Sequence, residues 1–374
     1  MLKGLIILKI SCNNYDLLEA LQAVQKASSS NTSFPILECI LFEADDLIKL
    51  TGNNLEIAIE YTIDGDIIEK GQTAVNSKII CEIIRRMPEG NILIETTAEG
   101  NIKISCGELE FNINGISGDD FPKIPDTDTL NKIEITADVL SSLVKTTSFA
   151  VAISDMKPIL TGIKLEFKDN EITAAAVDGY RLAVKTVKTE NKMPECSCVI
   201  PGKSLTEFCK ITGSADEEII INISDKSALF DFGRCKFFTR LLEGEFINYT
   251  NIIPKEYKYN LEVSVSDLIK SVDRAALMSE SDSNKTPIKV IYDNDKMSVL
   301  CTTQRGSVTD VLNVKSEGNE IIEVGYNCKY LMDALKAAST QDVKIEITGS
   351  INPTVIKPVE GDDFIFIVLP VRLK

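Results

Sequence analysis

Residues 266–278, SDLIKSVDRAALM, and residues 288–303, IKVIYDNDKMSVLCTT, contain the pattern that decides the fold. In the first stretch apolar residues recur at spacings of three and four, which predicts an amphipathic helix. The second is rich in β-branched residues on either side of Asp293-Asn294-Asp295, which predicts two strands joined by a tight turn. A helix followed by short strands is therefore the unit from which this chain is built.

The same unit occurs six times, with successive helix starts 61, 61, 66, 63 and 61 residues apart. Several predicted helices begin beside a capping residue, such as Asn14, Asn76 and Asn327. Turn residues, including Lys168-Asp169-Asn170, divide the strand-like stretches between the helices. The six helical windows are YDLLEALQAVQKA (15–27), NSKIICEIIRRM (76–87), ADVLSSLVKTTSF (137–149), KSLTEFCKIT (203–212), SDLIKSVDRAALM (266–278) and NCKYLMDALKAAS (327–339).

The repeats are expected to pair into three similar domains, because one helix cannot cover about four strands alone. A chain of 374 residues also has the length of two or three domains. Proline-containing, loop-like stretches place the boundaries near Asn131 and Tyr259, which gives domains at 1–131, 132–258 and 259–374. Each domain should hold two helices and antiparallel sheets, so the predicted fold class is α+β.

The composition is that of a globular protein and argues against several kinds of site. The chain has no histidine, the commonest general base and metal ligand. It has neither of the glycine-rich phosphate-loop motifs, so we expect no cofactor and no metal. Its ten cysteines are scattered, and we interpret even the pair Cys196 and Cys198 as ordinary strand or loop residues. No apolar run approaches the 18 residues of a membrane span, so we expect a cytoplasmic protein without membrane contact.

Charge is distributed unevenly between the predicted helices and the rest of the chain. The formal net charge is −16, which argues against a general affinity for nucleic acid. The six helical windows hold eleven Lys or Arg against eight acids, a net charge of +3, and leave −19 elsewhere. Taken alone, this is explained by lysines on solvated helix faces. If all six helices faced one cavity, however, they would form a weakly basic lining inside an acidic shell.

An enzymatic function is a weaker alternative. Paired carboxylates could serve a hydrolase, and Asp119-Asp120 and Asp362-Asp363 are the candidates. Adjacent residues on a strand point to opposite faces, so neither pair makes a good catalytic dyad by itself. We therefore expect no catalytic residues.

Eight motifs, in this order, resemble the bacterial sliding clamp, the beta subunit of DNA polymerase III, over nearly the full length. They are LLEALQAVQKASSSNTSFPIL near the start, LTGNNLEIAI (50–59), RRMPEG (85–90), DDFPKIP (119–125), DGYRLAV (178–184), LLEGEFINY (241–249), YNCKYLMDAL (326–335) and the terminal LPVRLK. The resemblance implies a DNA-clamp fold that closes as a head-to-tail homodimeric ring. Helices would line the hole, and duplex DNA would pass through it without sequence readout.

The resemblance also implies a pocket that binds short linear peptides rich in Leu and Phe. Its partners would be the DNA polymerase III catalytic subunit, the clamp loader, and repair and other proteins with a clamp-binding motif. Apolar walls would supply most of the binding energy, and the Arg181 guanidinium and backbone groups would fix the peptide's orientation. The implied pocket residues are Leu160, Val177, Gly179, Tyr180, Arg181, Leu182, Ile247, Asn251, Ile252, Ile367, Val368, Leu369, Pro370, Val371 and Arg372.

The resemblance further implies phosphate contacts and a ring interface. The implied phosphate contacts are Lys26, Lys78, Arg85, Lys157 and Lys203, and the interface would bring Phe111 against Leu277 and Met278.

The chain departs from the family pattern at several positions. Asn31, Ser77 and Gly202 replace basic residues, and the loop 246–251 lacks the family's proline and basic residues. Residues 1–6, MLKGLI, extend beyond the usual start of the family. These departures keep open a monomeric peptide-binding scaffold, or a divergent clamp copy without ring function.

Overall fold

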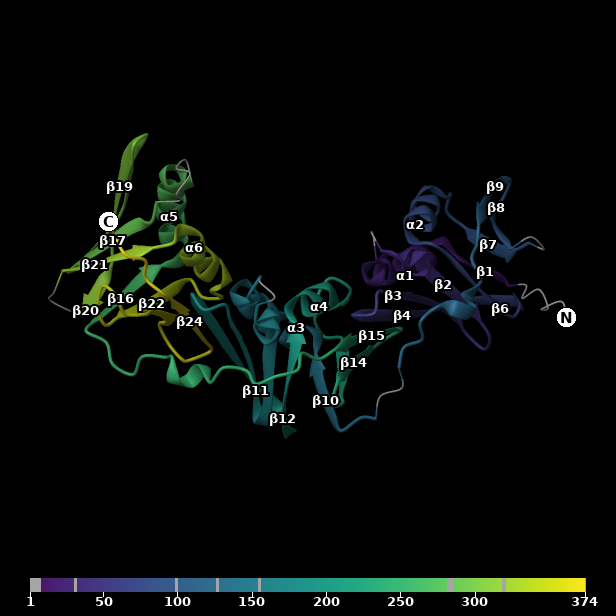
Figure 1. The fold of residues 1–374 in the computed structure, drawn as a ribbon, viewed down its shortest axis with the longest axis horizontal. Helices are drawn as coiled ribbons and strands as arrows, with labels where there is room; N and C mark the ends of the chain where they lie inside the picture. The colour runs from purple at the N-terminus through teal and green to yellow at the C-terminus, as the bar shows by residue number, and fades with distance from the viewer. Residues whose placement is uncertain are drawn as a thin grey trace. The chain divides into compact units, whose positions relative to one another are not determined.

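The computed structural model describes residues 8–29, 32–97, 100–125, 128–153, 156–280, 286–317 and 321–373. These residues form two compact units of helices and antiparallel sheets, drawn in Figure 1. The first unit comprises the described residues of Met1–Ala137 together with Glu207–Leu241, and the second those of Asp138–Thr206 and Leu242–Lys374. Each of the four sheets lies within one unit, and the predicted α+β class is confirmed.

The first unit contains a five-stranded and an eight-stranded sheet. In pairing order, the five strands are β5 (Gly65–Glu69), β1 (Lys9–Asn13), β7 (Asn91–Thr96), β8 (Asn101–Cys106) and β9 (Leu109–Asn114). The eight strands are β10 (Asn131–Thr136), β13 (Glu218–Ile223), β14 (Ser227–Phe232), β15 (Cys235–Arg240), β4 (Ile57–Ile63), β3 (Ile48–Asn53), β2 (Cys39–Ala44) and β6 (Gly71–Asn76).

The second unit contains a seven-stranded and a four-stranded sheet. In pairing order, the seven strands are β11 (Gly162–Val177), β12 (Arg181–Pro201), β24 (Phe364–Val368), β23 (Thr354–Pro358), β22 (Asp342–Ile347), β16 (Tyr259–Ser264) and β20 (Lys315–Glu317). The four strands are β19 (Gly306–Asn313), β18 (Lys296–Thr303), β17 (Ile288–Asp293) and β21 (Ile322–Tyr326).

All six predicted helices are present, several of them shorter than their windows. They are α1 (Asn14–Val24), α2 (Ser77–Arg86), α3 (Ala137–Thr147), α4 (Gly202–Phe208), α5 (Val265–Glu280) and α6 (Cys328–Ala337). Asn76 and Asn327 cap α2 and α6 as expected, because their side chains accept backbone N–H groups of the first turn. At α1 the cap is Asn13, which accepts from the N–H of Tyr15, whereas Asn14 is already helical.

Amphipathic helices pack in pairs against the sheets of their own unit. α1 contacts α2 and strands of both sheets in the first unit, and α5 contacts α6 and strands of both sheets in the second. On α1 the buried side chains include Leu17, Leu21 and Val24, all fully buried. Each such side chain stabilises the fold by about 1.5–3 kcal/mol relative to leaving it in water. The apolar stripe thus fixes the inward side of the helix and leaves its charged side exposed.

One of the predicted hairpin turns is wrong, and another is confirmed. Asn294, with φ of 48°, lies in the turn between β17 and β18, as expected. Lys168-Asp169-Asn170, in contrast, lies inside β11. Phe167 pairs with Cys196 and Glu171 with Lys188, so the strand continues through a shift of register. The left-handed backbone of Asp169, with φ of 52°, therefore makes an irregularity within the strand instead of reversing the chain.

Candidate functional site

The predicted peptide pocket has a floor made by one face of four neighbouring strands, β11, β12, β24 and β23. Val177 lies opposite Leu182, Leu182 opposite Ile367, and Ile367 opposite Val355. Residues directly opposite in an antiparallel sheet share a face, so these four side chains form one apolar row. They belong to one buried cluster, in which each of the four is at most 5% exposed.

Two connecting segments build the walls above this row. Leu160, from the short 3-10 helix η5 (Pro158–Thr161), packs against the cluster. On the segment that follows β15, Phe246 and Tyr249 are buried in the cluster and Ile252 packs against it. The segment's other predicted residues, Ile247 and Asn251, are exposed.

A charged hydrogen bond attaches the second wall to the sheet. The Tyr249 hydroxyl donates to Glu166 on β11, and Lys164 Nζ lies 2.8 Å from the other oxygen of the same carboxylate. Burial, reinforced by the adjacent Glu166, raises the pKa of Tyr249 above its ordinary value of 10.0. The hydroxyl therefore keeps its proton and remains a donor to the carboxylate.

The predicted turn at Asp178-Gly179 joins β11 to β12. Asp178 Oδ1 accepts the backbone N–H groups of Tyr180 and Arg181 at 2.9 and 3.1 Å, as in an Asx turn. Gly179 has φ of +90°, a conformation that L side chains rarely adopt, and a Cβ there would meet nothing within 4 Å. Backbone conformation, rather than lack of space, thus explains the glycine.

Arg181 is buried below the pocket floor instead of lining it. Strand alternation places its side chain on the face opposite Leu182, and only 6% of the residue is exposed. Its Nε donates to Asp178 Oδ2 at 2.9 Å, and Nη1 donates to Asp333 Oδ2 on α6 at 2.5 Å. The guanidinium also lies over the ring of Tyr330, 4.6 Å from its centroid. The guanidinium therefore lies on the other side of the sheet from the apolar row that contains Leu182.

The C-terminal segment forms the far rim of the pocket. The backbone N–H of Leu369 donates to the carbonyl of Tyr180 at 2.9 Å, and that of Val371 donates to the carbonyl of Gly325 at 2.8 Å. Leu369 packs against the buried cluster. Pro370, Val371 and Arg372 line a groove of about 890 Å³, which the exposed Ile351 and part of β21 complete.

The structure brings six of the fifteen predicted pocket residues into or against the apolar cluster. Val368 pairs with Arg181 and, like it, lies on the face opposite Leu182 and Ile367, so its side chain is not part of the apolar row. Gly179 and Tyr180 lie in the turn at the rim. The predicted residues that lie in the cluster or pack against it are Leu160, Val177, Leu182, Ile252, Ile367 and Leu369.

Sequence reasoning missed several residues of this region. Tyr330 on α6 stacks on Tyr180 with ring centroids 5.8 Å apart, and Asp333 holds Arg181. Both lie within YNCKYLMDAL, where helical spacing alone does not mark them. Phe246, Tyr249 and Val355 were missed as well. The aromatic residues near EGEF were a usable signal, whereas Val355 is identified only by its strand pairing.

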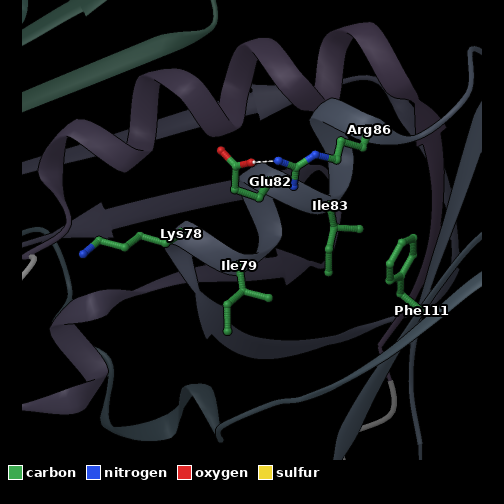
Figure 2. Close-up of a pocket in the computed structure, with 6 residues that line it drawn as sticks. All are labelled: Lys78, Ile79, Glu82, Ile83, Arg86 and Phe111. Atoms are coloured by element: carbon green, nitrogen blue, oxygen red, sulfur yellow. Dashed lines mark ion pairs between the residues drawn. The ribbon is translucent and has the colours of Figure 1, made fainter.

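A second candidate site lies in the first unit, at α2 and β9. Figure 2 shows Ile79 and Ile83 projecting from the same side of α2, with Phe111 of β9 beside them. The residues enclose a pocket of about 360 Å³, and Lys78, Glu82 and Arg86 also line it. The other side of β9, which is the last strand of its sheet, has no partner strand in the described chain. Phe111, predicted at a ring interface, is thus partly exposed at an open edge.

The other two residues predicted at this interface lie on α5 in the second unit. Leu277 is 68% exposed, and Met278 is half-buried. Beside them β19, an end strand of its sheet, shows one edge without a described partner, and Val311 on this strand is 52% exposed. Arg274 of α5 is joined to Asp310 of β19 by an ion pair. This surface therefore combines an open strand edge with exposed apolar side chains.

The predicted phosphate contacts differ in whether their side chains form ion pairs within the protein. The structure gives Lys26, Lys78, Lys157 and Lys203 no ion pair within the described residues, and all but Lys26 are exposed. Arg85, in contrast, is paired with Glu82 on the next turn of α2. Glu82 also accepts from Arg86 at 2.9 Å, so one carboxylate offsets part of the charge of two arginines.

At two of the three positions where the resemblance implies a basic residue, the structure offers a local explanation for the residue present. Ser77 is buried and its hydroxyl accepts a hydrogen bond from Ser28 at 3.0 Å. At Gly202, the first residue of α4, a Cβ would lie 2.9 Å from Cγ2 of Val151, so a larger residue would require Val151 to move. Asn31 and residues 1–6 lie outside the described residues.

Among the described residues, no group of three or more His, Cys, Asp or Glu side chains is placed to hold a metal ion. None of the helices in the described part of the chain is long and apolar enough to cross a membrane. Asp119, from one of the two carboxylate pairs, accepts a hydrogen bond from Gln72 at 3.0 Å. Cys196 and Cys198 are free and lie on β12, as ordinary strand residues.

Comparison with known proteins places three consecutive matches along the chain. The family models are the N-terminal domain of the DNA polymerase III beta subunit at residues 8–125, its central domain at 134–248 and its C-terminal domain at 250–372. The chain is 32% identical to the beta sliding clamp of Staphylococcus epidermidis over 357 residues, which cover 93% of this chain and 94% of the relative. A beta sliding clamp of Staphylococcus aureus is 31% identical over the same length.

Solved structures agree with these matches. A DNA polymerase sliding clamp from Bacillus subtilis is 30% identical, with a TM-score of 0.93 and coverage of 98% of this chain and 100% of that one. A DNA polymerase III beta chain from Streptococcus pneumoniae is 25% identical, with a TM-score of 0.94 and the same coverage. With each of its three family matches in order and its fold shared along almost the whole length, the chain belongs to the family of DNA polymerase III beta subunits, the bacterial sliding clamps.

Proposed function

We propose that this sliding clamp works as a non-catalytic processivity factor, a homodimeric ring that encircles duplex DNA in the cytoplasm. Its peptide pocket would tether the DNA polymerase III catalytic subunit, the clamp loader and other proteins with a clamp-binding motif. Retention on DNA would come from topology, so the ring needs only weak, sequence-independent contacts to phosphates.

Three domains per protomer, at 1–131, 132–258 and 259–374, would give the ring six domains. The proposal is supported by the three consecutive family matches. The first boundary falls in the gap between the matches that end at 125 and start at 134, and the second lies about ten residues after the break at 248–250. The repeat of two helices and antiparallel sheets, inferred from the periodicity of the sequence, supports it independently.

The observation that carries the ring is that two of the eight end strands in the described sheets, β9 and β19, lie beside exposed apolar side chains. Phe111 lies at the first edge and Leu277 beside the second, and both edges also carry exposed aliphatic side chains, Leu109 and Val311. Pairing β9 of one protomer with β19 of its partner would continue both sheets and bury these groups. Two such contacts, related by symmetry, would close the ring.

DNA contact is proposed for Lys26, Lys78, Lys157 and Lys203, whose ammonium groups have no ion-pair partner in the described chain. Arg85 is retained as a weaker contact, because Glu82 offsets its charge. Each freely held lysine that meets a phosphate releases about one counterion, which makes retention dependent on salt.

Peptide binding is proposed for the row Val177, Leu182, Ile367 and Val355 with its walls at Leu160, Ile252 and Leu369. The row itself is buried, so an inserted Leu or Phe side chain would gain its contact from the partly buried wall residues, at about 25 cal/mol per Å² of apolar surface covered. Backbone groups of Gly179 and Pro370, with Tyr180 and Tyr330 at the rim, would orient the peptide.

The alternative is a monomeric peptide-binding scaffold. It is motivated by the missing basic residues, and it predicts the pocket without the ring. Light scattering over a series of concentrations separates the two. A mass of twice 41.2 kDa that persists on dilution, with retention on nicked circular but not linear DNA after loading, is expected for the ring. A monomer at all concentrations that still binds peptide would favour the scaffold.

A further inference from the structure

We propose that Arg181 is a positioning residue, which fixes the walls of the peptide pocket before a peptide arrives and does not itself bind the peptide. This inference rests on the peptide-binding function proposed above. It concerns the residues that fix the geometry of the site. One of these is Asp333, which lies on α6, outside the pocket floor.

The placement of Arg181 argues against direct contact with a peptide on the floor. Arg181 and Leu182 are consecutive on β12, so their side chains point to opposite faces of the sheet. Leu182 lies in the floor, whereas Arg181 is enclosed on the other face and is only 6% exposed. Its guanidinium lies over two rings, 4.6 Å from the centroid of Tyr330 and 5.5 Å from that of Phe149.

The contacts of Arg181 connect three elements that are distant in sequence. Asp178 belongs to the β11–β12 turn, and Asp333 belongs to α6, 152 residues along the chain from Arg181. The same turn offers the carbonyl of Tyr180 to the N–H of Leu369, which is a wall of the pocket. The path from α6 through Arg181 and the turn therefore ends at a side chain that a peptide would meet.

The buried ion pairs of Arg181 with Asp178 and Asp333 oppose movement of the turn relative to α6. A buried arginine with two carboxylate partners loses more when one partner is removed than an exposed pair does, because the remaining charge is left unpaired. Other placements of the turn or of α6 would separate the groups and are disfavoured. A pocket held in its binding geometry spends less free energy on ordering when the ligand binds.

The experiment measures affinity for a fluorescein-labelled synthetic peptide containing Leu and Phe, by anisotropy, with the full-length protein. The variants are Arg181→Gln, Asp333→Asn, the double variant and Arg181→Lys. We expect each single charge-removing change to weaken binding by roughly tenfold, and the double variant to be no weaker than the worse single one, because the two residues act as one unit. Arg181→Lys should recover part of the affinity.

A panel of peptides in which each polar residue is replaced by Ala distinguishes positioning from direct contact. Positioning predicts the same loss from Arg181→Gln for every peptide in the panel. The matched control is Arg234→Gln, which breaks an exposed pair with Asp64 outside the pocket and should leave affinity unchanged.

The inference is overturned if Arg181→Gln binds like wild type, or if its effect disappears with one particular peptide side chain, which would identify that side chain as its partner. It is also overturned if Asp333→Asn has no effect. If Arg181→Gln does not fold, by circular dichroism, Asp333→Asn and Arg181→Lys decide between the two roles. A wild-type protein that binds none of the peptides contradicts the proposed peptide-binding function itself, and the inference falls with it.

Discussion

Leu182 and Ile367 lie directly opposite each other across β12 and β24, 185 residues apart in the sequence. This pair joins the part of the chain that matches the central domain of the family to the part that matches its C-terminal domain. The floor of the proposed peptide pocket therefore exists only when both parts are folded and paired.

Truncating Ile367 tests this floor. Ile367→Ala removes a side chain that is 1% exposed, so we expect unfolding to become easier by about 2–5 kcal/mol. Affinity for a peptide rich in Leu and Phe should also fall, because the row between Leu182 and Val355 is interrupted. Ile133→Ala, at an equally buried isoleucine of β10, is the control for stability, and it should leave peptide affinity unchanged. Equal losses of affinity in both variants would show that the row containing Ile367 is not part of the peptide-binding site.

The proposed ring interface is tested by Leu277→Asp. The side chain is 68% exposed in the protomer, so the substitution should change the protomer's stability by no more than about 0.5 kcal/mol. In the ring it would place a carboxylate in an apolar contact, and the protein should become monomeric by light scattering. Leu130→Asp, at another exposed leucine, should remain dimeric. A dimer with the Leu277→Asp variant would move the interface elsewhere.

The fold was predictable from the sequence because its signals are local. Six helices follow from apolar spacing, and the Asp178-Gly179 turn follows from residues that favour positive φ. The turn predicted at Lys168-Asp169-Asn170 failed for a related reason. Residues that favour turns also fit an irregularity inside a strand, and only the long-range pairing of β11 with β12 distinguishes the two.

The site was less predictable, because it depends on register and on contacts between distant segments. The pattern at 178–184 marks Arg181 as unusual. It does not show which of the two consecutive side chains, Arg181 or Leu182, lies on the face that forms the pocket floor. The same alternation separates Val368 from Ile367. Asp333 gives no signal of its own, since its role arises only where α6 meets the turn.

Salt dependence tests which cations contact DNA. Lys203 is exposed without an ion pair in the described chain, so Lys203→Ala should reduce the slope of log retention against log salt by about one, the value of a single phosphate contact. Arg85→Ala should reduce it less, because Glu82 already pairs with that guanidinium. The measurement is binding of nicked plasmid over a salt series. An Arg85 effect as large as that of Lys203 would show that the ion pair opens when DNA is present.

The ion pair between Arg274 and Asp310 gives the surface near β19 a predictable pH dependence. Hydrogen bonding from Arg274 lowers the pKa of Asp310 below its ordinary value of 3.8, despite the opposing effect of burial. A carboxyl whose pKa is lowered by folding stabilises the protein at pH values above its pKa in the unfolded state. This contribution is lost as the pH falls through its pKa in the folded state. Both side chains are partly exposed, so the contribution should be below about 1 kcal/mol.

Asp310→Asn removes this titration. We expect the variant to be slightly less stable than wild type at pH 7, and the difference to shrink as the pH falls below 3.8. Denaturant unfolding at several pH values measures the difference, and Asp225→Asn, at a turn residue with no ion pair in the described chain, is the control. A difference that persists unchanged at a pH low enough to protonate Asp310 would mean that the substituted amide is destabilising for a reason other than the lost charge. The explanation from Arg274 would then be wrong, because the stability that the ion pair contributes must be lost when the carboxylate is protonated.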